Sequence, residues 1–178
     1  MTIYLILALV LSLLLAAIGL GIMLVMVWSV LVGVPLVPTH MPQAKRMMEL
    51  GGVAPGKTII DLGSGAGRLI FLAAELGATA IGYELNPFLY FWTLYIIWRR
   101  GLHGKVSMRF RSLYKADVSQ ADVVFAFLFP KPMKMLEPKL LGEMHPGAKI
   151  VSYGFSMPGV VPAVKEQGIY VYDVPSKR

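Results

Sequence analysis

The sequence predicts an α/β domain that is built on a mainly parallel sheet and preceded by one membrane-spanning helix. Three observations carry this prediction. The charged residues, which make up only 15% of the chain, all lie at or after Lys45. Strand-like and helix-like segments then alternate, as they do where helices cover a parallel sheet. A glycine-rich turn joins the first strand of this series to the helix that follows it.

The N-terminal apolar segment is the first element. Residues Ile3–Val34 carry no charge, and about 20 apolar residues suffice to cross a bilayer core. A cleaved signal peptide is the alternative, but it would begin with basic residues and have an apolar stretch of about 7–15 residues. Basic residues follow the segment at Lys45 and Arg46, and none precedes it. We therefore expect residues 1–36 to form a single-pass membrane anchor, with residues 37–178 on the cytoplasmic, or equivalent inner, side.

The segments between the anchor and the middle of the chain alternate between helix and strand. Glycines and a proline mark their ends, and apolar residues recur at helical spacing in the second helix. We predict, in order, a helix over residues 42–50, a strand over 57–61, a helix over 66–76, a strand over 78–84, and a helix from Asn86, its N-cap, to about Arg100.

The remaining segments predict how the strands are placed in the sheet. Residues 105–111 alternate between apolar and polar or charged side chains, which indicates a strand at a sheet edge. Residues 121–128 form an almost continuous apolar run, as in a central strand that is buried on both faces. A helix over 131–141 and strands over 149–153 and 169–174 complete the set. Little chain follows the last strand, so we expect no terminal hairpin and a sheet one strand short of the usual number.

The glycine-rich turn is the segment most informative about chemistry. It reads Asp61-Leu-Gly-Ser-Gly-Ala-Gly-Arg68, and its G-x-G-x-G spacing differs from the G-x-G-x-x-G of dinucleotide sites. Glycines let a ligand lie against the main chain, and the amino end of the following helix offers free N–H groups. This G-x-G-x-G spacing, preceded by an acid at the end of the strand, resembles the S-adenosylmethionine site of class I methyltransferases. A tight turn without a ligand is the alternative.

Glu84 provides a second feature, at the end of the next predicted strand. A carboxylate there can accept hydrogen bonds from both hydroxyls of a ribose, although it could also be a solvated strand end without a ligand. The two features in this order favour cofactor binding. A D/N-P-P-Y motif is absent, and Phe127-Leu-Phe-Pro-Lys-Pro-Met133 stands in its place, which counts against methylation of nucleobases.

The composition excludes several other kinds of site. The chain has no cysteine, and its three histidines lie far apart in the sequence, so we expect no disulfide and no metal centre. The net charge of +7 lies after the apolar segment, without the basic and aromatic runs of nucleic-acid modules. We therefore expect the basic surface to face anionic membrane lipid, and we expect no nucleic-acid partner.

A closer resemblance rests on four segments: Val37-Pro-Thr39, the glycine-rich turn, Gly82-Tyr-Glu-Leu-Asn-Pro87 and Trp98-Arg-Arg-Gly101. They resemble the membrane-anchored lysine methyltransferases of the ATP synthase c-subunit and the adenine nucleotide translocase, and the prokaryotic relatives of these enzymes. The resemblance spans residues 37–174. It implies a Rossmann-like class I methyltransferase fold with S-adenosyl-L-methionine as the cofactor.

The resemblance also implies which residues form the cofactor site. They are Thr39, Asp61, Gly63, Ser64, Gly65, Gly67, Arg68, Glu84, Leu85, Asn86 and Ser112. Two positions depart from the family pattern. Ala66 stands where the relatives often have aspartate, and Ser112 stands where an acid near the adenine is usual.

The function implied is methylation of a lysine on a membrane protein or a membrane-associated protein. A lysine must first lose its proton, and burial against apolar walls lowers its pKa without a dedicated base, so we name no catalytic residue. The substrate-side candidates are Phe127, Phe129, Pro130 and Met133. Two alternatives remain: methylation of a lipid, a quinone or another apolar molecule, and a non-catalytic membrane adaptor that retains the fold. The sequence does not specify the acceptor or the oligomeric state.

The helix that follows Asn86 is apolar nearly all round, which in a surface helix calls for a further partner. We expect most of its aromatic residues to pack on the sheet, and part of the helix to meet lipid or a substrate helix. These aromatic residues are Phe88, Tyr90, Phe91, Trp92, Tyr95 and Trp98.

Overall fold

The chain divides into two compact units, Met1–Leu36 and Val37–Arg178, in a computed structural model that describes residues 2–31 and 39–176. The first unit contains the predicted helix, α1 (Thr2–Leu31). By length and composition, its segment Thr2–Leu24 is apolar enough to cross a membrane. The predicted end of the anchor at residue 36 lies outside the described residues.

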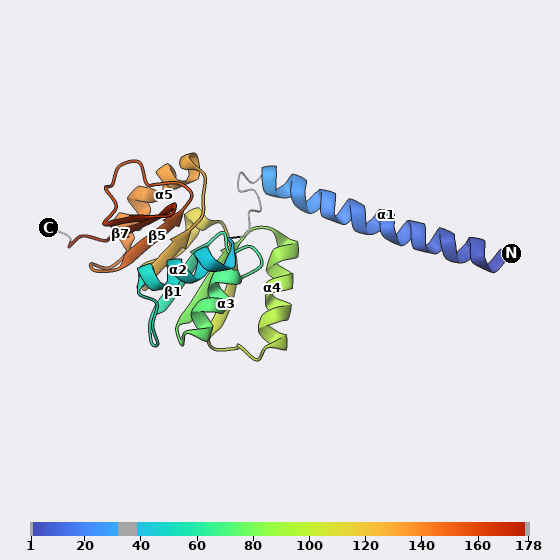
Figure 1. The fold of residues 1–178 in the computed structure, drawn as a ribbon, viewed down its shortest axis with the longest axis horizontal. Coiled ribbons are helices and arrows are strands. Elements are labelled where there is room, and N and C mark those ends of the chain that lie inside the picture. Colours follow the sequence, from blue (N-terminus) through green and yellow to red (C-terminus); the bar gives the residue numbers. More distant parts are fainter. Residues whose placement is uncertain (1, 32–38, 177–178) are drawn as a thin grey trace. The chain divides into compact units, whose positions relative to one another are not determined.

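The second unit is built around one sheet (Figure 1). This sheet has seven strands in the order β3-β2-β1-β4-β5-β7-β6. The strands are β1 (Thr58–Leu62), β2 (Thr79–Glu84), β3 (Val106–Phe110), β4 (Val123–Ala126), β5 (Lys149–Tyr153), β6 (Val164–Glu166) and β7 (Ile169–Asp173). Strands β1 to β5 are parallel, and β7 runs antiparallel between β5 and β6. The predicted edge and central strands are both confirmed, because β3 lies at one edge and β4 in the middle.

Helices pack on both faces of this sheet. They are α2 (Met41–Gly51), α3 (Arg68–Glu75), α4 (Pro87–Arg99) and α5 (Pro130–Glu143), with a short 3-10 helix, η1 (Leu113–Lys115). One core joins the inner sides of α2, α3 and α4 to alternate strand residues such as Ile59 and Phe125. The intervening strand residues, such as Ile60, point to the other face, where α5 buries Leu136. Figure 1 shows α5 apart from the other three helices.

The carboxyl ends of the parallel strands lie along one edge of the sheet, because these strands run in the same direction. Asp61 of β1 pairs with Gly82 of β2, and Glu84 ends β2 opposite Phe110 of β3. The loops that follow β1 to β4 therefore gather at this edge, which we call the carboxyl edge. Ligands of open α/β sheets bind at such an edge.

The expectation of a sheet without a terminal hairpin is wrong. β6 and β7 form an antiparallel hairpin joined by Gln167 and Gly168, whose φ angles of 49° and 79° are both positive. Two central residues with positive φ are typical of the type I′ turn, whose twist matches that of paired strands. The additional strand, β6, comes before the last strand in the sequence, so the hairpin needs no chain after β7. It is also tied to α2, because Arg46 donates two hydrogen bonds of 2.8 and 2.7 Å to Glu166.

The prediction that most aromatic side chains of α4 pack on the sheet is wrong. Five of them are exposed, with exposed fractions between 45% for Tyr95 and 67% for Trp98, and we call this set the aromatic face: Phe88, Phe91, Trp92, Tyr95 and Trp98. Only the ring of Tyr90 is partly covered, by Phe110 at 5.3 Å between centroids. The buried side of α4 is formed instead by Thr93 and Ile97.

Candidate cofactor and substrate site

The glycine-rich turn between β1 and α3 has a backbone that glycine adopts more readily than other residues. Gly63, Gly65 and Gly67 have φ angles of 86°, 55° and 82°. The N–H groups of Gly63 and Ser64 both donate to the carbonyl of Tyr83, at 2.9 and 3.0 Å. The turn is thereby fixed to the end of β2, and it leaves Gly63 exposed at the carboxyl edge.

Gly82 allows this turn to approach β2 closely. A Cβ atom at Gly82 would lie 2.6 Å from Ser64 Oγ and 2.6 Å from Met108 Sδ, so a side chain has no room there. Ser64 is itself buried, with its Oγ 3.7 Å from the same sulfur. The glycine that opens the Gly82–Pro87 segment therefore serves the packing of the turn.

Glu84 holds the turn from the end of β2. Its Oε2 accepts a hydrogen bond of 2.8 Å from the N–H of Gly65, and its Oε1 accepts from the N–H groups of Leu85 and Asn86, at 2.8 and 2.7 Å. A carboxylate offers about four lone-pair positions, so these three bonds leave about one, on Oε2. Glu84 can therefore accept one ribose hydroxyl with its present bonds intact. To accept a second ribose hydroxyl, Glu84 must give up one of these three hydrogen bonds.

Asn86 begins α4 directly beside this carboxylate. Its Oδ1 accepts from the N–H groups of Phe88 and Leu89, at 3.0 and 3.3 Å, and Pro87 occupies the first helical position. The predicted N-cap is confirmed. Asn86 is buried, and its main role in this structure is to fix where α4 starts relative to Glu84.

Thr93 belongs to this site, and the sequence reasoning missed it. The residue is fully buried on the inner side of α4, and its hydroxyl donates to the carbonyl of Gly65 at 3.2 Å. Gly65 is thus held on both sides, through its N–H by Glu84 and through its carbonyl by Thr93. The signal in the sequence was a lone threonine within an apolar helix, because a buried hydroxyl needs a hydrogen-bond partner.

Asp61 is a buried carboxylate at the end of β1. It is 5% exposed, and it takes part in none of the ion pairs found among the described residues. Burial, and secondly the neighbouring charge of Glu84, raises the pKa of Asp61 to about 7. A cationic group bound against Asp61 would offset this cost of burying a charge. The predicted contact with the ammonium group of the cofactor fits this environment.

Arg68 connects the turn to the segment that precedes α2. Its guanidinium donates a hydrogen bond to the carbonyl of Thr39, and Thr39 is buried. The structure thus places Thr39, a predicted cofactor residue, beside the start of α3. Val37 and Pro38, the other residues of this family segment, lie outside the described residues.

Leu85 and Ser112, the remaining predicted cofactor residues, follow β2 and β3. Leu85 is half-buried and lies between Glu84 and Asn86. Ser112 is half-buried two residues after the end of β3, where η1 begins. Because β2 and β3 are parallel, the structure brings both residues to the carboxyl edge.

Phe127 and Phe129, in the loop after β4, are two of the substrate-side candidates. Their rings pair with rings that follow or end β5: Phe127 with Tyr153, at 4.9 Å between centroids, and Phe129 with Phe155, at 5.3 Å. Phe129 is exposed and Phe127 is half-buried. These paired rings form an aromatic wall at the carboxyl edge of β4 and β5.

Pro130 and Met133, the other two candidates, lie in α5. Pro130 is exposed at the first position of the helix, whereas Met133 is fully buried one turn later. Met133 therefore belongs to the core in this structure. The accessible members of the predicted set are Phe127, Phe129 and Pro130.

The sheet order, the glycine-rich turn and the two strand-end carboxylates together define an S-adenosylmethionine-dependent methyltransferase domain. A solved structure described as an RNA methyltransferase from Salinibacter ruber, in complex with S-adenosyl-L-homocysteine, is similar to this chain with a TM-score of 0.75 and 34% sequence identity. The match covers 80% of this chain and 96% of that one. The predicted fold and the predicted cofactor, S-adenosyl-L-methionine, are thereby confirmed. No group of His, Cys, Asp and Glu suited to a metal ion occurs in the part of the chain that the structure describes.

Within this class the chain belongs to the ANTKMT methyltransferase domain family, whose model matches residues 61–164. The ATP synthase c-subunit lysine N-methyltransferase of Homo sapiens is 35% identical over 148 residues, which are 81% of this chain and 63% of the relative. The adenine nucleotide translocase lysine N-methyltransferase of Mus musculus is 34% identical over 175 residues, which are 89% of this chain and 76% of the relative. The predicted family is confirmed. The chain spans less than two thirds of the length of the human relative.

Proposed function

We propose that this chain transfers a methyl group from S-adenosyl-L-methionine to the Nζ atom of a lysine in a membrane protein. The observation that carries the proposal is the pair of hydrogen bonds to Gly65, from its N–H to Glu84 and from Thr93 to its carbonyl, which fixes the glycine-rich turn. The chain belongs to a family whose relatives are named as lysine methyltransferases. Both relatives named above act, by their names, on membrane proteins. The same class of acceptor fits a chain with a 30-residue apolar helix at its N-terminus.

The site residues have separate parts in this reaction. Asp61 would hold the ammonium group of the cofactor, Glu84 would hold its ribose, and the turn would support it along the main chain. When bound, the cofactor supplies an electrophilic methyl group on a sulfonium sulfur. The wall of Phe127 and Phe129 desolvates the acceptor lysine, which favours its neutral, nucleophilic form. Nζ would lose one proton to water before transfer; it would then bond to the methyl carbon, the sulfur would keep the electrons of the broken bond, and the methylated Nζ would carry the positive charge that the sulfonium loses. Alignment of these atoms is the main contribution of the protein.

The proposal includes anchorage by α1, with the second unit on the cytoplasmic, or equivalent inner, side of the membrane. The apolar composition of α1 supports the anchorage, and Lys45 and Arg46 support the orientation, because basic residues that flank a span stay on that side. Anionic lipid is then the surface that the basic second unit faces.

Transfer of tritiated methyl groups into native membranes tests the acceptor. The membranes are incubated with the full chain and then separated into protein, lipid and RNA fractions, and the protein is hydrolysed to identify methyllysine. The proposal expects label in methyllysine, and it expects Asp61→Asn to abolish most of it. Label in lipid or quinone would support the small-molecule alternative, label in RNA would overturn the proposal, and cofactor binding without transfer into any fraction would indicate an adaptor.

A further inference from the structure

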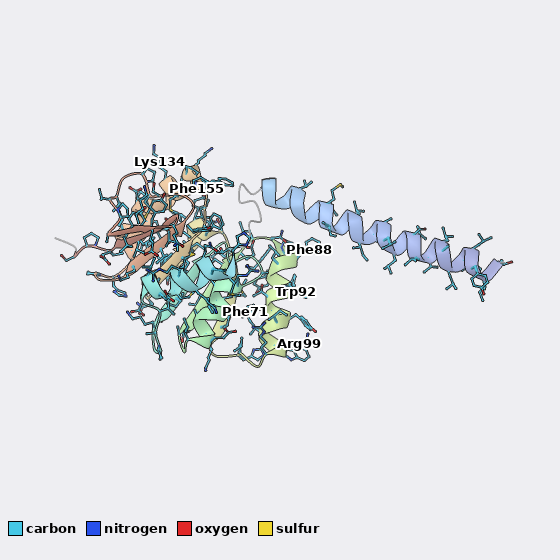
Figure 2. The ribbon with its side chains drawn as sticks, viewed as in Figure 1. Phe71, Phe88, Trp92, Arg99, Lys134 and Phe155 are labelled. Atoms are coloured by element: carbon cyan, nitrogen blue, oxygen red, sulfur yellow. The ribbon has the colours of Figure 1, made fainter. Side chains whose placement is uncertain are left out.

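The aromatic face of α4 is an exposed apolar stripe on the surface of the second unit. Its members recur at helical spacing along one side of the helix, opposite the buried Thr93 and Ile97. Neighbouring rings contact one another, with centroid distances of 5.9 Å between Trp92 and Tyr95 and 6.1 Å between Tyr95 and Trp98. Figure 2 shows Phe88, Trp92 and the charged Arg99 in succession along α4. Exposed apolar stripes of this size mark interaction surfaces.

The residue types of this stripe are those of a membrane interface. Two tryptophans and a tyrosine lie among the phenylalanines, and such amphipathic rings settle at the level of lipid headgroups. Exposed basic residues follow at the end of the helix, at Arg99 and, after one short turn, at Lys105. Aromatic residues next to cations complement a bilayer that carries anionic lipids.

The second unit follows α1 closely in the sequence, so a chain anchored by α1 has a membrane available to this stripe. Thr39, the first described residue of the second unit, follows Leu31 of α1 by eight positions in the sequence. Thr39 accepts a hydrogen bond from Arg68, and a Cβ on the adjacent Gly67 would lie 2.8 Å from Thr93 of α4. The first described residue of the second unit therefore lies beside the turn that α4 supports.

We infer that the aromatic face of α4 is a membrane-docking surface, which inserts into the headgroup region of an anionic bilayer while α1 spans it. This inference rests on the proposed anchorage and deepens it, because a second contact fixes the orientation of the catalytic unit. Since Asn86, which caps α4, donates its N–H to Glu84, docking places the carboxyl edge close to the membrane surface. A lysine at the end of a membrane-embedded helix is then within reach of the site.

Site-directed spin labelling tests the inference, and the absence of native cysteine makes single-site labels possible. The labelled variants of the full chain are Phe91→Cys and Trp98→Cys on the aromatic face, Met135→Cys on α5 and Leu14→Cys in α1. Met135 is a matched control, because it is as exposed as the aromatic residues, at 57%, and lies on the helix that packs on the other face of the sheet. Each variant is reconstituted in vesicles of phosphatidylcholine and phosphatidylglycerol. Accessibility to oxygen, which concentrates in lipid, is compared with accessibility to a water-soluble nickel complex.

We expect labels at 91 and 98 to shift toward oxygen accessibility on transfer from detergent to vesicles, and the label at 135 to remain accessible to nickel. A label at 14 within lipid, combined with labels at 91 and 98 in water, would overturn the docking surface while leaving the anchorage intact. A label at 14 in water would overturn both. Dipolar broadening at 91 or 98 that disappears on dilution with unlabelled protein would identify a second copy of the chain as the occupant, and would also overturn the inference. None of these readouts depends on methyl transfer, so they are independent of the proposed activity.

Discussion

The carboxylate of Glu84, at the end of β2, accepts a 2.8 Å hydrogen bond from the backbone N–H of Gly65 in the turn after β1. This bond joins the two sequence features from which the cofactor site was predicted. It also means that a hydrogen bond within the protein holds the turn in its shape. Residues predicted to bind the cofactor therefore contribute to the stability of the fold as well.

Glu84→Gln should lower both the stability of the fold and the affinity for the cofactor. An amide cannot accept all three N–H groups that the carboxylate accepts, so at least one partly buried donor loses its partner. We expect the free energy of unfolding to fall by about 1–2 kcal/mol, and the affinity for S-adenosylmethionine to fall roughly tenfold or more. Urea unfolding and calorimetric titration measure the two effects. Glu75→Gln is the control, because Glu75 is exposed on α3 and makes only a 3.7 Å ion pair with Arg100; it should leave both quantities nearly unchanged.

Asp61→Asn should separate stability from binding. The pKa of Asp61 is raised from its ordinary value of 3.8 to about 7, so the folded protein binds a proton that the unfolded chain has already released. The stability of the cofactor-free protein should therefore decrease as pH rises from about 4 to about 7. Asp61→Asn should remove this slope and increase the free energy of unfolding at pH 8, by on the order of 3 kcal/mol. If the variant is no more stable than the parent at pH 8, the claim that the buried charge of Asp61 destabilises the fold is wrong.

The same carboxylate should make cofactor binding depend on pH. The ammonium group of the cofactor needs Asp61 in its charged form, so affinity should fall by up to about tenfold per unit as pH drops below 7. Titrations in buffers of different ionisation enthalpy should show proton release on binding near pH 7. Asp61→Asn should bind weakly with little dependence on pH over this range. A parent affinity that is flat between pH 6 and 8 would argue against the contact.

Gly67→Ala tests how tightly the turn packs on α4. Gly67 has a φ of 82°, and an added Cβ would lie 2.8 Å from both Phe71 and Thr93. We expect a loss of roughly 2–4 kcal/mol in the free energy of unfolding, from backbone strain and overpacking together. Gly101→Ala is the matched control, because Gly101 also has a positive φ but has nothing within 4 Å of the Cβ position, and it should cost only about 1 kcal/mol. Equal losses in the two variants would show that the close contact is unimportant.

Removal of α1 tests the role proposed for the anchor. A chain without residues 1–33 keeps all residues assigned to the cofactor, so its affinity for S-adenosylmethionine should equal that of the full chain. Its methylation of acceptors in native membranes should fall, because tethering raises the effective concentration of such acceptors. Filter binding and tritium transfer measure the two properties. Unchanged transfer into membranes would contradict the role of the anchor.

Much of the second unit could be predicted because its strong signals are local. The buried strands, the Asn86 N-cap and the glycine-rich turn each depend on residues that are close in sequence. The β6–β7 hairpin was missed because β6 has only three residues, none of them fully buried, and its Gln167-Gly168 turn lacks the usual asparagine or aspartate. Tertiary contacts such as the ion pair of Arg46 with Glu166 support it.

In the candidate site, too, the features that depend on local sequence could be predicted and those that depend on tertiary contacts could not. Asp61 and Glu84 were predicted from their places at strand ends, since parallel strands bring those ends together. Thr93 was not, because its partner is the carbonyl of Gly65, and 28 residues separate the two. The aromatic face of α4 was misjudged because helical periodicity cannot show which side of an all-apolar helix faces the sheet. The small Thr93, and not a large ring, faces the turn, since Gly67 leaves room only for a small neighbour.

Calorimetric titration of the purified full chain with S-adenosylmethionine tests the central claim most directly. We expect binding of one cofactor molecule per chain, with an affinity that both Glu84→Gln and Asp61→Asn reduce and that Glu75→Gln preserves. Absence of binding by the parent chain between pH 6 and 8, or equal affinity in all four proteins, would contradict the assignment of this edge of the sheet as the cofactor site.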